Sequence, residues 1–313
     1  MVAASVRDVT ERERRIALDH VLALIAEAPW SSSLVLRGSM TMPAWAGDAA
    51  RPPGDLDWVV LEDEVGVDPL DPYPYARRIE DVQQWPEAFA GAARYDLWRE
   101  EEFGTGGQRG ILPPEGLSWV DSEDVDPSPP YQDLLERVRE RPYAGAGVVL
   151  DAAGARDDGQ WTYAEYDTPG VRLSIPWRLE HPGTLTGVAQ LDFARDELLP
   201  EPPVWTLVPR ITDRPPTPVR TASRALSLAW KLRWLHTDAT AQGRAQGKDL
   251  YDAVLLAESP RTHLSGRLLR RVLGEFEPAT VTGWEVEWTG EFARRGTARE
   301  WSGRLRRALE SRF

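Results

Sequence analysis

Asp55 and Asp57 are the residues of this chain best suited to chemistry, because they open the apolar stretch 56–61, LDWVVL. Side chains alternate along a strand, so a D-x-D pair at the start of a strand places both carboxylates on one face. Two carboxylates this close repel each other unless a cation lies between them. Mg²⁺ is the expected ion, since it takes one or two protein carboxylates and completes its octahedron with water and phosphate oxygens.

A second motif, Gly38-Ser39, ends the apolar segment 33–37, and fifteen residues separate it from Asp55. Glycine permits close approach of the backbone to a ligand, and the serine hydroxyl adds a donor, which suits the binding of a triphosphate. Together the two motifs predict metal-assisted phosphoryl or nucleotidyl transfer by in-line displacement. An isolated D-x-D pair is also common on solvated loops, but the strand end upstream and the apolar run downstream favour a site.

A third carboxylate is expected on a neighbouring strand. Asp192 lies among apolar residues late in a predicted hairpin formed by 170–180 and 185–194, with the turn signal HPGT between them. A buried aspartate needs a partner, and a metal shared with Asp55 and Asp57 would supply one. The alternative is an aspartate on an edge strand that faces water.

Lysine is rare in this chain. Only Lys231 and Lys248 are lysines among 37 basic residues, and a compact ammonium differs chemically from the planar arginine fork. Lys231 lies on a predicted helix, 221–237, from which it could reach a cleft and neutralise a triphosphate. Asp249 and Asp252 share one face of the next predicted helix, and their alternative role is to cap its first turn.

The order of these motifs resembles the AbiEii/AbiGii nucleotidyltransferase family, which includes the MenT-type toxins. The resemblance covers residues 33 to 257, and its most distinctive part is the segment KDLYD at 248–252. The departures are a long spacer between the Gly-Ser and D-x-D motifs, an apparent acidic, Pro-rich insertion at 62–165, and a long spacer between Lys231 and the KDLYD segment.

The resemblance implies an α+β chain: a polymerase-beta-like nucleotidyltransferase fold, with a mixed sheet flanked by helices, and then a helical C-terminal domain. It implies that Gly38 and Ser39 bind the nucleotide phosphates, that Asp55 and Asp57 hold Mg²⁺, and that Lys231 contacts the NTP. Either Asp249 or Asp252 completes the catalytic set, and Lys248 joins the nucleotide-binding residues. Relatives are toxins paired with an antitoxin, and some add nucleotides to the 3′ end of tRNA.

The elements that must position these residues follow from periodicity. A first helix is expected at 8–28, strands at 33–37 and 56–61, and further helices at 131–141, 248–258 and 261–274. The Pro-rich segment 200–218 is interpreted as a connector. We therefore expect a nucleotidyltransferase domain over residues 1–213 and a basic helical domain over 214–313.

Composition limits the alternatives. The chain has 313 residues and no cysteine, which excludes disulfides, zinc-thiolate sites and cysteine nucleophiles. It has neither a Walker-type phosphate loop nor a dinucleotide fingerprint, and its four histidines lack metal-ligand spacing. No apolar run is long enough for a membrane span and no signal peptide is evident, so a cytoplasmic protein is expected.

Charge is distributed unevenly. The whole chain carries −13, whereas residues 214–313 alone carry +7. This basic half would suit an RNA acceptor, although a solvated helix face is the alternative for each of its arginines. The candidates for phosphate contacts are Arg261, Arg267, Arg270, Arg271, Arg304, Arg306 and Arg307. Two other functions stay open: nucleotidyl transfer to a protein or small molecule, and a catalytically inactive binding module.

Overall fold

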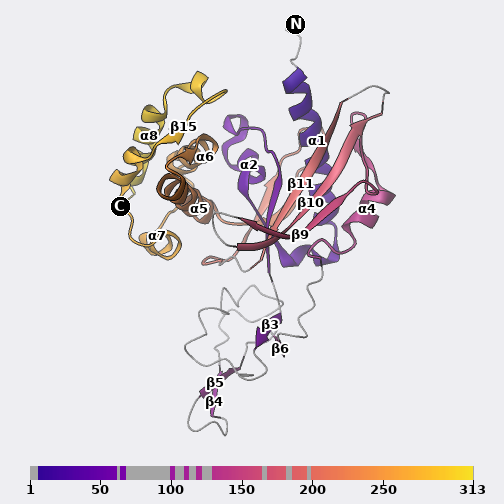
Figure 1. The fold of residues 1–313 in the computed structure, drawn as a ribbon, viewed down its shortest axis with the longest axis horizontal. Coiled ribbons are helices and arrows are strands. Elements are labelled where there is room, and N and C mark those ends of the chain that lie inside the picture. Colours follow the sequence, from indigo (N-terminus) through magenta and orange to yellow (C-terminus); the bar gives the residue numbers. More distant parts are fainter. Residues whose placement is uncertain are drawn as a thin grey trace.

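The structure of the chain is a computed structural model that describes residues 6–61, 64–67, 99–102, 109–112, 118–121, 129–163, 168–180, 185–195 and 199–312. Its α-helices are α1 (Val6–Ala26), α2 (Met42–Ala46), α4 (Leu134–Glu140), α5 (Arg224–Thr237), α6 (Gly247–Glu258), α7 (Gly266–Leu273) and α8 (Ala298–Glu310). The chain is α+β, as expected, with helices on both faces of a mixed sheet (Figure 1).

The main sheet has nine strands, in the order β12-β13-β1-β2-β11-β10-β8-β7, and β9 pairs with β10 beside this path. Their bounds are β1 Leu34–Arg37, β2 Leu56–Val60, β7 Tyr143–Gly145, β8 Val148–Leu150, β9 Arg156–Tyr163, β10 Thr168–Leu179, β11 Thr186–Ala194, β12 Val204–Val208 and β13 Thr217–Thr221. The pairs β1–β13 and β2–β11 are parallel, whereas β1–β2 and β10–β11 are antiparallel.

Three separate two-stranded sheets complete the described strands. They pair β3 (Glu64–Val67) with β6 (Ser118–Asp121), β4 (Arg99–Glu102) with β5 (Arg109–Leu112), and β14 (Ala245–Gln246) with β15 (Val286–Glu287). Among the residues with a described structure, no helix combines the length and apolar character needed to cross a membrane.

The two central strands are buried on both faces, which explains their continuous apolar runs. Along β1, Leu34 and Leu36 join the core under α1 and α4, whereas Val35 joins the core under the C-terminal helices. Along β2, Trp58 faces the first core and Val59 the second. Side chains alternate along a strand, so odd-numbered positions of β2 face the C-terminal helices.

Two expectations about the chain between the motifs are corrected. The interpretation of 62–165 as an insertion is wrong for its last part, because α4 packs in the first core and β7 and β8 extend the main sheet. Segment 200–218 is no simple connector either, since β12 and β13 pair antiparallel within it. Prolines obscured these strands; Pro218 is the second residue of β13 and pairs with Leu207 of β12, whereas β13 pairs with β1 at Thr221.

The expected domain boundary at 213/214 falls between β12 and β13 of one sheet. We propose that residues 1–222 carry the sheet and that the helical part begins with α5. Ser223 caps α5 by accepting a hydrogen bond from the amide of Leu226. In the same way Ser265 caps α7, which therefore starts at Gly266 rather than at the expected residue 261.

A substitution of Phe193 tests the first hydrophobic core, because this residue is fully buried on β11, next to Asp192. The change Phe193→Ala is expected to lower the free energy of unfolding by about 3–5 kcal/mol, since it removes a ring and leaves a cavity. Urea denaturation followed by tryptophan fluorescence measures this. Val188 lies on the same strand with 45% of its surface exposed, so Val188→Ala should change the free energy by less than about 0.5 kcal/mol; equal losses would contradict the core assignment.

Candidate active site

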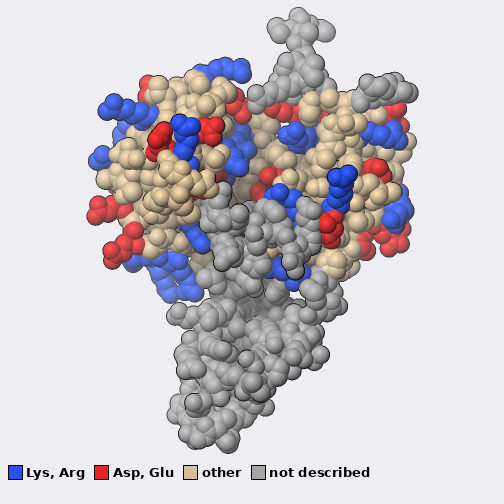
Figure 2. Space-filling model, viewed as in Figure 1, with Lys and Arg blue, Asp and Glu red and all other residues tan. Residues whose placement is uncertain are grey.

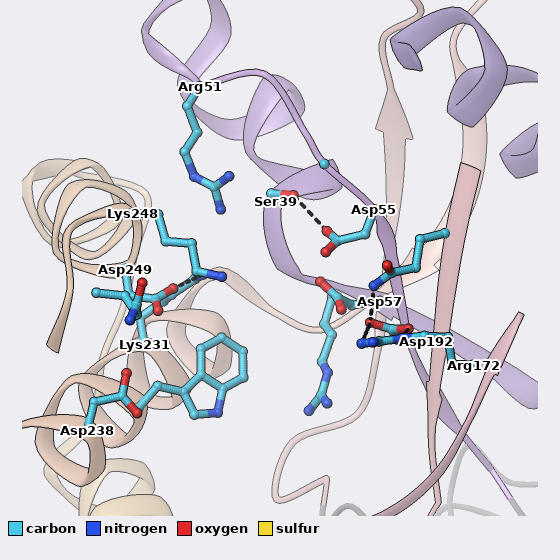
Figure 3. Close-up of a pocket in the computed structure, with 15 residues that line it drawn as sticks. Ser39, Arg51, Asp55, Asp57, Arg172, Asp192, Lys231, Asp238, Lys248 and Asp249 are labelled. Carbon is cyan, nitrogen blue, oxygen red and sulfur yellow. Dashed lines mark hydrogen bonds and ion pairs between the residues drawn. The ribbon is translucent and has the colours of Figure 1, made fainter. Parts of the chain in front are cut away.

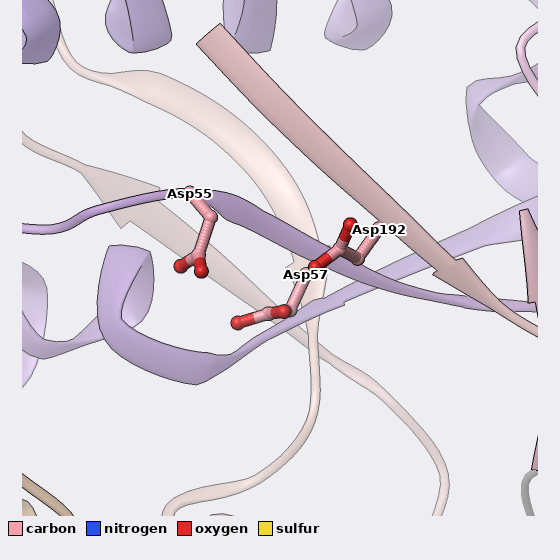
Figure 4. A group of neighbouring side chains, drawn as sticks. All are labelled: Asp55, Asp57 and Asp192. Atoms are coloured by element: carbon pink, nitrogen blue, oxygen red, sulfur yellow. The ribbon is translucent and has the colours of Figure 1, made fainter. Parts of the chain in front are cut away.

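The three predicted carboxylates converge. Asp55, Asp57 and Asp192 each offer an oxygen, and these oxygens lie within 4.8 Å of one another (Figure 4). Asp192 stands directly beside Asp57 because β11 runs parallel to β2 with these two residues in register. Strand alternation then puts both side chains on the face toward the C-terminal helices. Asp192 is only 3% exposed and lies on an interior strand of the sheet, so it is not a solvated edge aspartate.

These carboxylates lie in a cavity of about 420 Å³ between the sheet and the C-terminal helices (Figure 3). The residues that line it are Arg37, Ser39, Arg51, Gly54, Asp55, Asp57, Arg172, Gln190, Asp192, Lys231, Trp234, Asp238, Gln246, Lys248 and Asp249. Seven predicted site residues are among them: Ser39, the three triad aspartates, both lysines and Asp249. Gly38 and Asp252, which were also predicted, do not line the cavity.

Asp57 shows the electrostatic consequence of this crowding. Burial, then the charge of Asp55, raises the pKa of Asp57 from its ordinary value to about 7, although Arg37 opposes the shift. A carboxylate that resists ionisation in this way is stabilised by a cation beside it. Three carboxylates with hard oxygen atoms are the donors that Mg²⁺ prefers, so the residues fit a divalent cation.

Asp192 is oriented by two neighbours that the motif analysis missed. Arg172 binds it through two hydrogen bonds, Nε to Oδ1 at 2.7 Å and Nη2 to Oδ2 at 2.9 Å. The amide of Gln190 donates a third, at 2.9 Å. Arg172 faces Asp192 across the β10–β11 pair, so the register of the predicted hairpin was the only signal that could have revealed it.

The Gly-Ser motif packs against the triad. Gly38 has φ of +75°, and a Cβ atom there would lie 2.1 Å from Oδ2 of Asp57. The glycine is therefore needed for a left-handed turn and for space. The hydroxyl of Ser39 donates to Oδ1 of Asp55 at 3.4 Å, so this serine reaches the first aspartate from the cavity wall.

The helical side of the cavity contains a buried charge network. Lys231 is ion-paired with Asp249 at 2.6 Å and with Asp252 at 3.3 Å. Arg51 donates to Asp252 through Nε at 3.2 Å and Nη2 at 3.0 Å. All of these groups except Arg51 are nearly inaccessible, and Asp252 is fully buried. Neither aspartate caps α6 in the expected way, because its N-cap residue is Gln246 and no side-chain hydrogen bond is formed there.

Pairing keeps this network charged. Burial opposes the charge on Lys231, but Asp249 and Asp252 outweigh it and raise the pKa of the ammonium. Burial likewise opposes ionisation of Asp249, but Lys231 and then Lys248 outweigh it and lower the pKa of that carboxyl. Breaking such a pair leaves an uncompensated charge and costs about 3–5 kcal/mol. The network therefore fixes α5 and α6 against the cavity.

Other cavity residues were not predicted from the sequence. Trp234 lies beside Lys231, whose Nζ is 4.9 Å from the ring centroid, and beside Arg37, whose guanidinium carbon is 5.6 Å away. Asp238 is 3% exposed at the end of α5. Arg51, Trp234 and Asp238 carry no sequence signal of their own, because only the packing of distant segments brings them to the cavity.

The substitution Gly38→Ala tests the Gly-Ser contact. The methyl group must displace the carboxylate of Asp57, so Mg²⁺ affinity is expected to fall at least about tenfold, beyond the ~1–2 kcal/mol of backbone strain at positive φ. Titration calorimetry with MgCl₂ measures it. Gly47 also has positive φ, +56°, but open space at its Cβ position. Gly47→Ala therefore introduces the backbone strain without a clash, and it should bind Mg²⁺ with wild-type affinity. Equal affinity in both variants would contradict the contact.

The raised pKa of Asp57 predicts a pH dependence. Because the folded protein keeps this proton up to about pH 7 and the unfolded chain loses it near pH 4, metal-free stability falls as pH rises through that window. Mg²⁺ must displace the same proton, so its affinity should rise about tenfold between pH 6 and pH 8. Calorimetric titrations at the two pH values measure this, and a flat profile like that of Asp57→Asn would refute it.

The comparisons with known proteins agree with this geometry. Residues 118–309, more than half of the chain, match the family described as nucleotidyl transferase AbiEii toxin, type IV TA system. No curated protein matches the chain. The matched range contains Asp192, Lys231 and Asp249 and begins after the Gly-Ser and D-x-D motifs, so the structure is what joins those motifs to the matched part.

Membership of this family implies an NTP substrate and an antitoxin partner, because its members are nucleotidyl transferases of toxin–antitoxin systems. A cluster of carboxylates that fits a divalent cation, with basic side chains lining the same cavity, suits such a transfer. The chain therefore belongs to the AbiEii nucleotidyl transferase toxin family.

Proposed function

We propose that this toxin is a Mg²⁺-dependent enzyme that transfers NMP from an NTP to an RNA acceptor, the 3′ end of tRNA. The observation that carries the proposal is the triad of Asp55, Asp57 and Asp192, with oxygens within 4.8 Å, in a cavity that Arg51 and Lys248 also line. Phosphoryl chemistry needs this combination of a metal site and countercharge for a polyphosphate.

The triad residues would hold the metal, with Asp55 and Asp57 as the first ligands and Asp192 as the third. Bound Mg²⁺ supplies Lewis-acid polarisation of the α-phosphate and activation of the acceptor hydroxyl. Arg172 and Gln190 keep the Asp192 carboxylate in one orientation through three hydrogen bonds. This orientation matters because a metal site tolerates little movement of its ligands.

In the proposed reaction, the acceptor hydroxyl oxygen forms a bond to the α-phosphorus and releases its proton to solvent. The bond from that phosphorus to the oxygen bridging to the β-phosphate breaks, and pyrophosphate leaves with the negative charge. Ser39 offers a hydroxyl on the triad side, and Lys248 is exposed on the opposite wall (Figure 3). These groups would bind the phosphates, while Lys231 and Asp249 hold that wall in place.

An RNA acceptor is supported by the arginines of the helical part. Those exposed on or just before α7 are Arg261, Arg267, Arg270 and Arg271. Figure 2 shows Lys and Arg side chains gathered over this part of the surface. Exposed arginines bind phosphates without reading sequence, as contact with an RNA backbone requires.

The remaining arginine candidates differ from these four. Arg304 forms a bidentate ion pair with Glu258, at 2.6 and 2.8 Å. Arg306 pairs with Glu310 at 2.7 Å. Arg307 is exposed on α8. We therefore propose the α7 group and Arg307 for phosphate contacts and leave the paired arginines to helix packing.

Labelled-acceptor assays test the function. The protein, each α-labelled NTP, Mg²⁺ and total cellular RNA are expected to give label in a tRNA-sized band. Asp57→Asn should reduce this by at least about a thousandfold, because it removes a metal ligand charge at the reacting phosphate. The matched control is Asp48→Asn, at an exposed residue of the segment between α2 and β2. This variant should label RNA as strongly as the wild type does.

The result also separates the alternatives. Label in protein or a small molecule, lost in Asp57→Asn, would keep nucleotidyl transfer and reject the RNA acceptor. No Mg²⁺-dependent NTP binding by the wild type would indicate an inactive binding module.

A further inference from the structure

Arg51 lies where the sheet and the helical part meet at the cavity. It belongs to the segment between a short 3₁₀ turn, Gly47–Ala49, and β2, four residues before Asp55. Its side chain comes from the sheet side, yet its only ion pair within the described chain is with Asp252 of α6. Figure 3 shows its guanidinium pointing into the space between Lys248 and Ser39.

The hydrogen bonds of Arg51 use one edge of the guanidinium. Nε and Nη2 both donate to the Asp252 carboxylate, at 3.2 and 3.0 Å. A guanidinium carries five N–H donors in a fixed plane. No described residue accepts a hydrogen bond from Nη1, and the side chain lines the cavity with 14% of its surface exposed. The second edge is thus available to a ligand.

The neighbouring cations are not equivalent to Arg51. Lys231 is ion-paired with two carboxylates at 2.6 and 3.3 Å, and only 6% of its side chain is exposed. Moving its ammonium away from these carboxylates toward a triphosphate would break a buried pair, at a cost of several kcal/mol. Lys248 is exposed and forms no ion pair within the described chain. Arg51 and Lys248 are therefore the cations of this wall that can meet a polyphosphate without breaking the network.

The segment that carries Arg51 is attached to α6 at two consecutive residues. Besides the Asp252 pair, the hydroxyl of Tyr251 donates to the carbonyl oxygen of Ala49 at 2.7 Å. The same segment leads directly into Asp55 of the triad. Arg51 is therefore connected to α6 by side-chain contacts and to the metal-binding carboxylates by the chain itself.

We propose that Arg51 is a nucleotide-binding residue that contacts the β- and γ-phosphates of the NTP, and that Asp252 is a positioning residue that holds its guanidinium. The inference rests on the proposed nucleotidyl transfer. A reacting α-phosphate beside the triad would leave the β- and γ-phosphates to extend toward Arg51 and Lys248, whose side chains lie across the cavity from the triad (Figure 3). Arginine suits this task because it can bind a carboxylate and a phosphate with different edges of one plane.

Calorimetric titration tests the contact. The wild type is titrated with each NTP and the corresponding NMP in Mg²⁺, and the tightest NTP is used for the variants. Arg51→Gln should lower the affinity for that NTP at least about tenfold, as expected for loss of a charge-assisted contact. Its affinity for the NMP should stay within about twofold of the wild-type value. Arg51→Lys should recover only part of the loss, because lysine keeps the charge but lacks the second edge.

The control is Arg244→Gln, which removes an exposed arginine that pairs with Glu285 outside the cavity; it should bind NTP as wild type does. Asp252→Asn should weaken NTP binding too, and the double variant with Arg51→Gln should be no weaker than Arg51→Gln alone, since both act through one guanidinium. Asp252 is fully buried, so circular dichroism must show that its variant folds; if it does not, the two Arg51 variants decide.

The outcomes are distinct. Wild-type NTP affinity in Arg51→Gln, or equal loss for NTP and NMP, would overturn the polyphosphate contact while the proposed function stands. Additive losses in the double variant would overturn the positioning role of Asp252. If the wild type binds no NTP in Mg²⁺, the proposed function itself fails, and the inference fails with it.

Discussion

Mutual repulsion among Asp55, Asp57 and Asp192 is the constraint on which the rest of this structure depends. The sheet holds the carboxylates together through the parallel pairing of β2 with β11, and burial then raises the pKa of Asp57 to about 7. The two strands have fully buried apolar side chains on their other face, which hold the cluster together along with the hydrogen bonds from Arg172 to Asp192. Hydrophobic packing thus maintains an electrostatic arrangement that is unfavourable until a cation binds.

On the opposite wall of the cavity, buried carboxylates are balanced by cations. Two aspartates of α6 are buried there, but Lys231 and Arg51 match their charge within hydrogen-bonding distance. This near-neutral network anchors the helices without competing for the metal at the triad. It leaves Lys248, together with one edge of Arg51, as positive charge directed at the cavity, so the network supports the site and also selects which cations a substrate can use.

The division of the chain follows from the same geometry. The cavity lies between the sheet and the C-terminal helices, and the second hydrophobic core joins the outer face of β1 and β2 to α5, α6 and α8. β13 belongs to this sheet, and it ends at Thr221, shortly before α5 begins at Arg224. Nucleotide site and helical part are therefore coupled by a shared core rather than by a flexible connector, which is why Pro-rich sequence alone was misleading there.

Local pattern determined much of this protein. The alternation of β2 placed Asp55 and Asp57 on one face, and helical periodicity located α1, α5 and α6 to within a few residues, because these properties depend on neighbours along the chain. The end of the first strand at Gly38 could be recognised for the same reason. Only the tertiary structure decided that Asp192 stands beside Asp57, that Arg172 orients it, and that Asp252 is buried behind Lys231. Strand register and helix packing are set by contacts between residues far apart in sequence, which no local spacing encodes.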